Sequence, residues 1–199
     1  PVSPYATSKL EAHRFIQSTR KKTKNFFCSG ILFNHESPLR GAEFVTKKII
    51  RTLVGIKKGE KTILELGNIY AKRDWGYAED HVKAMLLMME ANKADDFVVG
   101  TGQSITVKDF IFKVCDYLNM PIVFEGSGLK EKCLDKKTGK LIIKIDKAYF
   151  RKKEVVSLKA DPKKIKKQLG WKAETNVDKL IRIMIEGEEI IRKQSLKYI

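Results

Sequence analysis

Short apolar runs alternate with amphipathic helical segments along most of this 199-residue chain, and this alternation restricts the possible folds more than any other feature. Apolar runs bounded by turn residues predict buried strands at residues 25–33, 62–66, 97–99 and 122–124. Helical periodicity predicts helices at residues 4–22, 43–58, 77–91, 107–119 and 176–193, with a further helix starting at Asp161-Pro162. Such an order is typical of an α/β fold with a parallel component.

Apolar side chains recur at helical spacing inside these segments, which predicts the helix faces that pack against the core. The first helix has its apolar positions at Tyr5, Leu10, Ala12, Phe15 and Ile16. The helix at residues 77–91 has apolar side chains spaced for burial at Val82, Met85, Leu86 and Met89. A methionine-rich stripe of this kind is far more often part of a core than of a cofactor site.

The chain is strongly basic, with 40 Lys and Arg against 24 Asp and Glu and a net charge of +16. Such a surface favours anionic partners, which include nucleic acid, acidic membrane and a nucleotide diphosphate. Cys28, Cys115 and Cys133 show no metal-ligand spacing, so we predict no metal site and expect a reducing, cytoplasmic compartment. No run of 18 apolar residues and no signal peptide are present, so no membrane association is predicted.

Tyr5 and Lys9 form a Y-x-x-x-K pair on one face of the first helix. An ammonium group close to a phenol stabilises the phenolate, which makes the tyrosine usable as a general base for a sugar hydroxyl. The same lysine can hydrogen-bond a ribose. The alternative is an ordinary helix surface, because Tyr149 and Lys153 satisfy the same spacing.

Two polar segments are further candidates for ligand binding. Residues 33–41 (FNHESPLRG) follow a predicted strand, and residues just past the carboxyl end of a strand line the ligand crevice of α/β sheets. The alternative is a polar loop in which Asn34 and Ser37 cap turns. Residues 72–76 (KRDWG), taken alone, are consistent with a salt-bridged turn that contains a packed indole.

These strings resemble one family when they are taken together. The S-P-Y-A-x-S-K context of Tyr5 resembles the catalytic helix of short-chain dehydrogenases/reductases. The NHESP-x-RG string, followed by FVTKKI at residues 44–49, closely resembles GDP-mannose 4,6-dehydratases, as does KRDWG. Residues 97–110, 148–154 and 161–172 resemble the family more loosely. The resemblance runs from Ser3 to about Ile191.

The resemblance implies the carboxyl-terminal part of an NAD(P)-binding Rossmann fold plus a smaller α/β sugar-nucleotide-binding domain. Residues 1–35 and 69–101 are expected in the first, and residues 36–68 and 102–199 in the second. The N-terminal strands and the Gly-rich turn of the Rossmann fold have no counterpart here, since Gly126-Ser127-Gly128 lacks the required spacing. The chain therefore looks like a cut through a larger protein.

The implied enzyme is a lyase that converts GDP-mannose to GDP-4-keto-6-deoxymannose through internal hydride transfer by NADP and loss of water. By matched position, the resemblance makes Tyr5 and Lys9 both catalytic and cofactor-binding. It places His35 and Arg40 on NADP. It places five residues on GDP-mannose, namely Asn34, Lys48, Arg73, Arg151 and Glu154. A homo-oligomer, dimer or tetramer, is expected for the complete enzyme.

Several features depart from the family or leave alternatives open. The family usually has Arg, Glu, His and Pro where this chain has Leu39, Gln103, Ile105 and Lys152. The Glu that acts as elimination base in the family has no counterpart, so we expect the chain alone to be inactive. One alternative is another extended nucleotide-sugar dehydratase or epimerase, against which the NHESP-x-RG string argues. The other is a basic module that binds nucleic acid through the lysine-rich residues 130–167.

Overall fold

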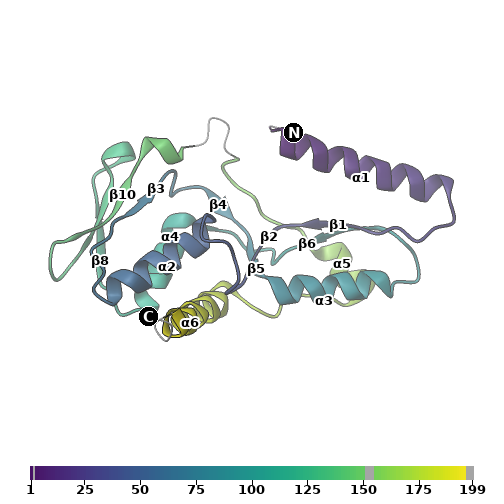
Figure 1. The fold of residues 1–199 in the computed structure, drawn as a ribbon. Coiled ribbons are helices and arrows are strands. Elements are labelled where there is room, and N and C mark those ends of the chain that lie inside the picture. Colours follow the sequence, from purple (N-terminus) through teal and green to yellow (C-terminus); the bar gives the residue numbers. More distant parts are fainter. Residues whose placement is uncertain (2, 151–154, 196–199) are drawn as a thin grey trace. The chain divides into compact units, whose positions relative to one another are not determined.

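The computed structural model describes residues 1, 3–150 and 155–195, which form two compact units. The first unit contains residues 1–35, 74–103 and 159–174. The second contains residues 36–73, 104–158 and 175–199. Figure 1 shows the elements of both units in chain order. Among the residues described, no helix combines the length and the apolar character that a bilayer span requires.

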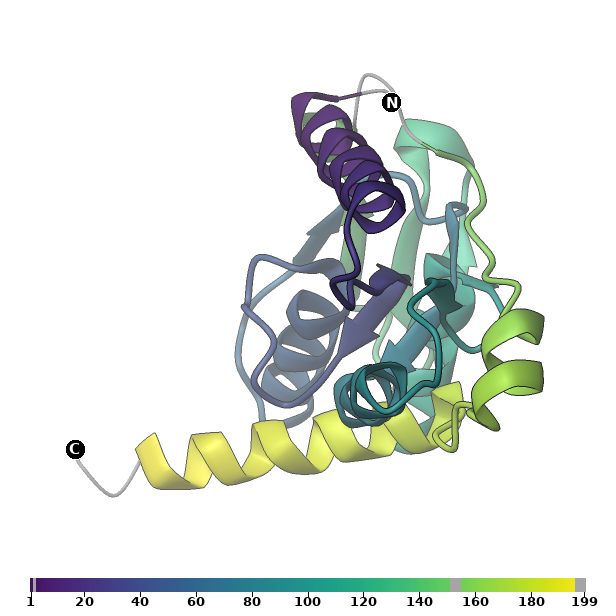
Figure 2. The same cartoon turned by 90° about the vertical axis from the view of Figure 1, so that its right-hand side faces the viewer.

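The first unit is built on a parallel pair of strands, β1 (Ser29–Leu32) and β6 (Asp96–Val99), with Ser29 opposite Asp96 and Leu32 opposite Val99. Helices α1 (Pro4–Lys22) and α3 (Ala78–Met89) cover opposite faces of this pair (Figures 1 and 2). Helix α5 (Lys163–Leu169) packs against β6. Strand β2 (Asn34–Glu36), whose first two residues belong to this unit, pairs with β5 (Trp75–Tyr77). The prediction of an α/β class with a parallel component is thus confirmed.

The core of the first unit contradicts the predicted face of α3. Its buried cluster contains Ala84, Met88, Phe97, Val99, Ile165 and Trp171. The stripe expected to be buried is exposed, by 51% at Val82, 39% at Met85, 59% at Leu86 and 69% at Met89. Both sides of this helix carry apolar residues, so periodicity alone could not choose between them. The close approach of Met88 to Gly30 on β1 selects the other side.

Helix α1 also differs from the expectation, because it buries no residue completely. Tyr5 and Phe15, which were predicted on its packing face, are 72% and 71% exposed. Polar contacts hold the helix to the strands instead. Arg20 lies 2.8 Å from Asp96 on β6, and Gln17 donates to the same carboxylate at 2.7 Å.

The second unit contains a four-stranded mixed sheet in the order β3-β10-β9-β8. Its strands are β3 (Leu64–Leu66), β10 (Leu141–Ile145), β9 (Lys132–Asp135) and β8 (Ile122–Glu125). Strand β10 runs parallel to β3 and antiparallel to β9, which is antiparallel to β8. A short antiparallel pair joins β4 (Lys72–Arg73) to β7 (Ile105–Thr106). Two turns of 3₁₀ helix occupy Gly128–Lys130 and Lys147–Tyr149.

Helices α2 (Val45–Lys57), α4 (Val107–Tyr117) and α6 (Val177–Ser195) contact one another in the second unit. Ile49, Phe110 and Ile111 are completely buried, and burial of each such side chain contributes about 1.5–3 kcal/mol. A capping box starts α4, because Thr106 accepts from the Asp109 amide while Asp109 accepts from the Thr106 amide. Strands β9 and β10, inside the lysine-rich stretch, were not predicted.

The two units differ from the expected domain segments at a few boundaries. Residues 69–73 lie in the second unit, whereas residues 102–103 and 159–174 lie in the first. The last segment joins the first unit because α5 packs on β6 and the amide of Ala160 donates to buried Asp74 at 3.1 Å. Packing alone defines these units, so their assignment to cofactor and substrate stays a prediction.

Candidate functional site

The amino-terminal turn of α1 carries the predicted Tyr5 and Lys9. Ser3 caps the helix by accepting from the amide of Ala6 at 3.1 Å, and Pro4 occupies the first helical position. Lys9 Nζ lies 5.5 Å from the centre of the exposed Tyr5 ring. The cation and the phenol therefore share one face of the helix.

Strand β2 places Asn34 beside His35 just after β1. The Nδ1 atom of His35 lies 2.9 Å from the carbonyl oxygen of Phe33. Its ring lies 5.0 Å, centre to centre, from the ring of His81, which belongs to α3 and is buried. Sequence reasoning missed His81, because nothing in the sequence distinguishes it from a histidine on a solvated helix face.

Arg40 lies in the loop between β2 and α2 and makes two contacts within the second unit. Its Nε atom is 3.2 Å from the carboxylate of Glu36. The Nε–H group makes no hydrogen bond among the described residues, so this contact is an ion pair. Its guanidinium carbon is 3.5 Å from the centre of the Phe44 ring. Glu36 is buried and also accepts from the hydroxyl of Thr46 at 2.7 Å. The guanidinium is thus held between a carboxylate and an aromatic face.

Lys48 and Arg73 are both held by backbone carbonyl groups in the second unit. Lys48 Nζ donates to the carbonyl oxygen of Glu65 at 2.7 Å and lies 3.7 Å from the centre of the Tyr149 ring. Arg73 donates to the carbonyl oxygens of Lys72 and Val155, both at 2.8 Å. Lys48 thus meets a carbonyl oxygen and an aromatic ring in these two contacts, and its ammonium charge suits an anion. Arg151 and Glu154 lie outside the described residues.

Asp74, the residue after Arg73, organises the first unit. Its buried carboxylate accepts from the hydroxyl of Thr101 at 2.6 Å and from the amides of Thr101, Gly102 and Ala160 at 2.9–3.1 Å. Among the described residues, the Asp74 carboxylate thus binds a hydroxyl and three amides and forms no ion pair. Trp75 is buried, as the packed-indole interpretation expected.

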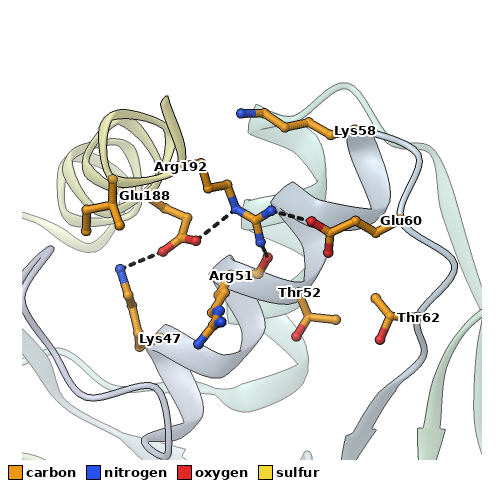
Figure 3. Close-up of a pocket in the computed structure, with 9 residues that line it drawn as sticks. Lys47, Arg51, Thr52, Lys58, Glu60, Thr62, Glu188 and Arg192 are labelled. Atoms are coloured by element: carbon orange, nitrogen blue, oxygen red, sulfur yellow. Dashed lines mark hydrogen bonds and ion pairs between the residues drawn. The ribbon is translucent and has the colours of Figure 1, made fainter. Parts of the chain in front are cut away.

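A pocket of about 730 Å³ lies in the second unit between α2 and α6, and none of the predicted site residues that the structure describes lines it. Figure 3 shows Arg192 between two carboxylates, those of Glu188 and Glu60. Glu188 also pairs with Lys47 at 2.7 Å. Both carboxylates of the pocket lining therefore pair with cations of the same lining. Among the described residues, no cluster of His, Cys, Asp and Glu is arranged to hold a metal ion.

The alternation of strands and helices, together with the Tyr5–Lys9 helix, defines an α/β protein of the nucleotide-sugar epimerase and dehydratase fold. The structure of RMD from Pseudomonas aeruginosa, complexed with NADPH, matches it with a TM-score of 0.78 at 22% identity. The match covers 96% of this chain and 58% of that chain, and at this identity it shows the fold alone.

The chain belongs to the GDP-mannose 4,6-dehydratase family, a family of lyases, because the model of that family matches residues 1–184. It is 43% identical to the GDP-mannose 4,6 dehydratase of Dictyostelium discoideum over 198 residues, which cover 100% of this chain and 56% of the relative. It is 42% identical to the human GDP-mannose 4,6 dehydratase, covering 96% of this chain and 52% of that protein. The chain thus spans about half the length of these relatives.

Proposed function

We propose that this chain takes part in the conversion of GDP-mannose to GDP-4-keto-6-deoxymannose with NADP as cofactor. The observation that carries the proposal is the Tyr5–Lys9 pair, whose 5.5 Å contact places a cation beside an exposed phenol in a chain of this family. The exposed phenol can reach a sugar hydroxyl, and the ammonium stabilises the phenolate left when Tyr5 acts as base.

The second unit offers groups suited to the substrate. Lys48 and Arg73 are long cationic side chains of the kind that binds a diphosphate, and each donates to a backbone carbonyl oxygen. We assign both to GDP-mannose, together with Asn34 of the first unit. The same assignment for Arg151 and Glu154 rests on the family resemblance alone.

The chemistry that NADP would supply here is reversible hydride acceptance from the sugar. We assign the cofactor to Lys9, whose ammonium can donate to ribose oxygens, to His35, and to Arg40, whose guanidinium already pairs with Glu36 and lies on the Phe44 ring. The 199 residues contain no G-x-G-x-x-G turn to hold a pyrophosphate. We therefore propose that these residues bind only part of NADP.

The lysine-rich residues 130–167 support the nucleic-acid alternative poorly. Several of their cations already pair with carboxylates, as Lys144 does with Glu65 at 2.7 Å and Lys164 with Asp95 at 2.6 Å. Locally paired cations neutralise fewer phosphates, and neutralised phosphates supply most of the affinity for nucleic acid.

The test is a mass-spectrometric assay for loss of one water from GDP-mannose in the presence of NADP. The purified chain is compared with a chimera in which the amino-terminal part of the Dictyostelium relative precedes Pro1. We expect product from the chimera, none from the chain alone, and none from the chimera with Tyr5→Phe. An active Tyr5→Phe chimera would overturn the catalytic assignment, and product from the chain alone would show that it contains its own elimination base. Homo-oligomerisation of the active chimera is part of the same proposal and is measured by light scattering.

A further inference from the structure

His35 and His81 are oriented by the same kind of hydrogen bond. The Nδ1 atom of His35 lies 2.9 Å from the carbonyl oxygen of Phe33, and that of His81 lies 3.0 Å from the carbonyl oxygen of Tyr77. A carbonyl oxygen can only accept, so the proton of each ring is on Nδ1. In a neutral imidazole the other nitrogen, Nε2, is then an acceptor. Both rings therefore present a lone pair at Nε2.

The ring of His81 has little freedom to move. It is 1% exposed, and a Cβ atom added at Gly76 would lie 2.5 Å from its Cε1 atom. The ring of Trp171 approaches it edge-on, with centres 6.3 Å apart and planes at 75°. Trp171 is itself held by a hydrogen bond from Nε1 to the carbonyl oxygen of Asp80 at 2.9 Å. The ring of His81 is thus fixed in place. The ring of His35 packs against it, with ring centres 5.0 Å apart and planes inclined by 37°.

The environment of His81 favours its neutral form. Its Nε2 atom is buried and has no hydrogen-bond partner among the described residues, so a proton there would be unsatisfied. Burial lowers the pKa of His81, and nearby His35 lowers it further. The Tyr77 carbonyl and the carboxylates of Asp74 and Asp80 act in the opposite direction but do not reverse the shift.

We propose that His81 is a positioning residue that holds the neutral form of His35 in one tautomer, in which the Nε2 lone pair can accept from a ligand. Such an acceptor binds an N–H or O–H donor, for example a carboxamide or a ribose hydroxyl of a dinucleotide, and not a phosphate oxygen. The identity of this ligand as NADP rests on the proposed function. The tautomer and its dependence on His81 rest on the geometry of the first unit alone.

The first test is NMR of the 199-residue chain with ¹⁵N-labelled histidine, in which only His13, His35 and His81 give signals. We expect the neutral form of His35 to carry its proton on Nδ1 and not on Nε2. His81→Ala removes the ring against which His35 packs, and it is expected to leave His35 as a mixture of tautomers. His81→Phe keeps a flat ring and is expected to restore the single tautomer. A tautomer mixture in the unmodified chain, or a His35 signal unaffected by His81→Ala in a folded variant, overturns the proposal.

The second test separates this inference from the proposed function by measuring NADP binding to the chimera. We expect His81→Ala to weaken binding about fivefold, the effect of one hydrogen bond, and His81→Phe to leave it unchanged. The Nε2 signal of His35 is expected to move when NADP binds. If the tautomer is fixed as predicted but NADP neither binds nor moves that signal, the cofactor assignment fails and the positioning role stands. If NADP binds but His35 is a mixture of tautomers, the positioning role fails instead.

Discussion

The ammonium of Lys47 lies 2.7 Å from the carboxylate of Glu188, and both side chains are buried in the second unit. The pair connects α2 to α6, and Lys47 also donates to the carbonyl oxygen of Pro38 at 3.0 Å. Close by, Gly187 packs so tightly on Pro38 that an added Cβ would lie 2.5 Å from its side chain. Helix α6 therefore supports the loop that carries Arg40.

Removal of the Lys47 charge is expected to destabilise the protein strongly. Lys47→Met leaves Glu188 buried beside a single remaining cation, Arg192, and breaking a buried pair costs about 3–5 kcal/mol. The matched control is Lys83→Met, because Lys83 pairs with Glu174 at 3.2 Å on an exposed surface, where solvent screening leaves a much smaller contribution to stability. Urea unfolding measures the free energy of unfolding of both variants. An equal decrease of this free energy in the two variants would show that burial does not strengthen the Lys47 pair.

Stability is expected to depend on pH through His81. The folded state keeps this ring neutral because its pKa is lowered, whereas in the unfolded chain it protonates near pH 6.5. Between these values the unfolded state binds more protons, so the free energy of unfolding falls as the pH is lowered from about 7. His81→Phe should remove this part of the slope between pH 7.5 and 5.5 in urea titrations. An identical slope in the variant would mean that other groups cause it.

The three cysteines are expected to differ in reactivity. Burial raises the pKa of Cys133 to about 12 and raises that of Cys115 further, so neither forms the nucleophilic thiolate at pH 8. Cys28 is only partly buried. A chromogenic disulfide reagent should therefore modify one thiol per folded chain, three in urea, and none in folded Cys28→Ser. Rapid reaction of more than one thiol in the folded chain would contradict the burial of Cys115 and Cys133.

Substitution of Arg73 is expected to weaken GDP-mannose binding to the chimera. Arg73→Ala removes the guanidinium group. Charge-assisted hydrogen bonds contribute about 1.5–3 kcal/mol, so the dissociation constant for GDP-mannose should rise about 10- to 100-fold. Arg182→Ala is the control, because Arg182 is exposed on α6 and lies 3.9 Å from Glu186. Titration calorimetry measures both variants. Unchanged affinity in Arg73→Ala would remove this residue from the proposed substrate site.

Local signals predicted much of the secondary structure. The predicted helix at residues 107–119 agrees with α4 (Val107–Tyr117), and the Ser3-Pro4 start agrees with α1. Helical periodicity and caps act within a few residues, so a single sequence contains them. Strands β9 and β10 were missed because their apolar residues are mixed with lysines, and their stability comes from pairing with β8 and β3.

Motifs predicted individual site residues but not their partners. Tyr5 and Lys9 are neighbours on one helix turn, so their contact follows from a four-residue spacing. His81 lies 46 positions after His35 in the sequence, and Glu188 lies still further from Lys47. No local pattern connects residues so far apart. Their contacts were therefore found only in the folded chain.

The sequence by itself determined the family, the α/β class, the positions of most helices and the identity of the candidate catalytic pair. These properties depend on motif strings and on spacings within single elements. Only the tertiary structure decided that α3 buries Met88 and exposes Met89, and that Lys47 pairs with Glu188. Burial and charge pairing depend on which elements meet in space, and two apolar faces of one helix are equivalent until packing selects one.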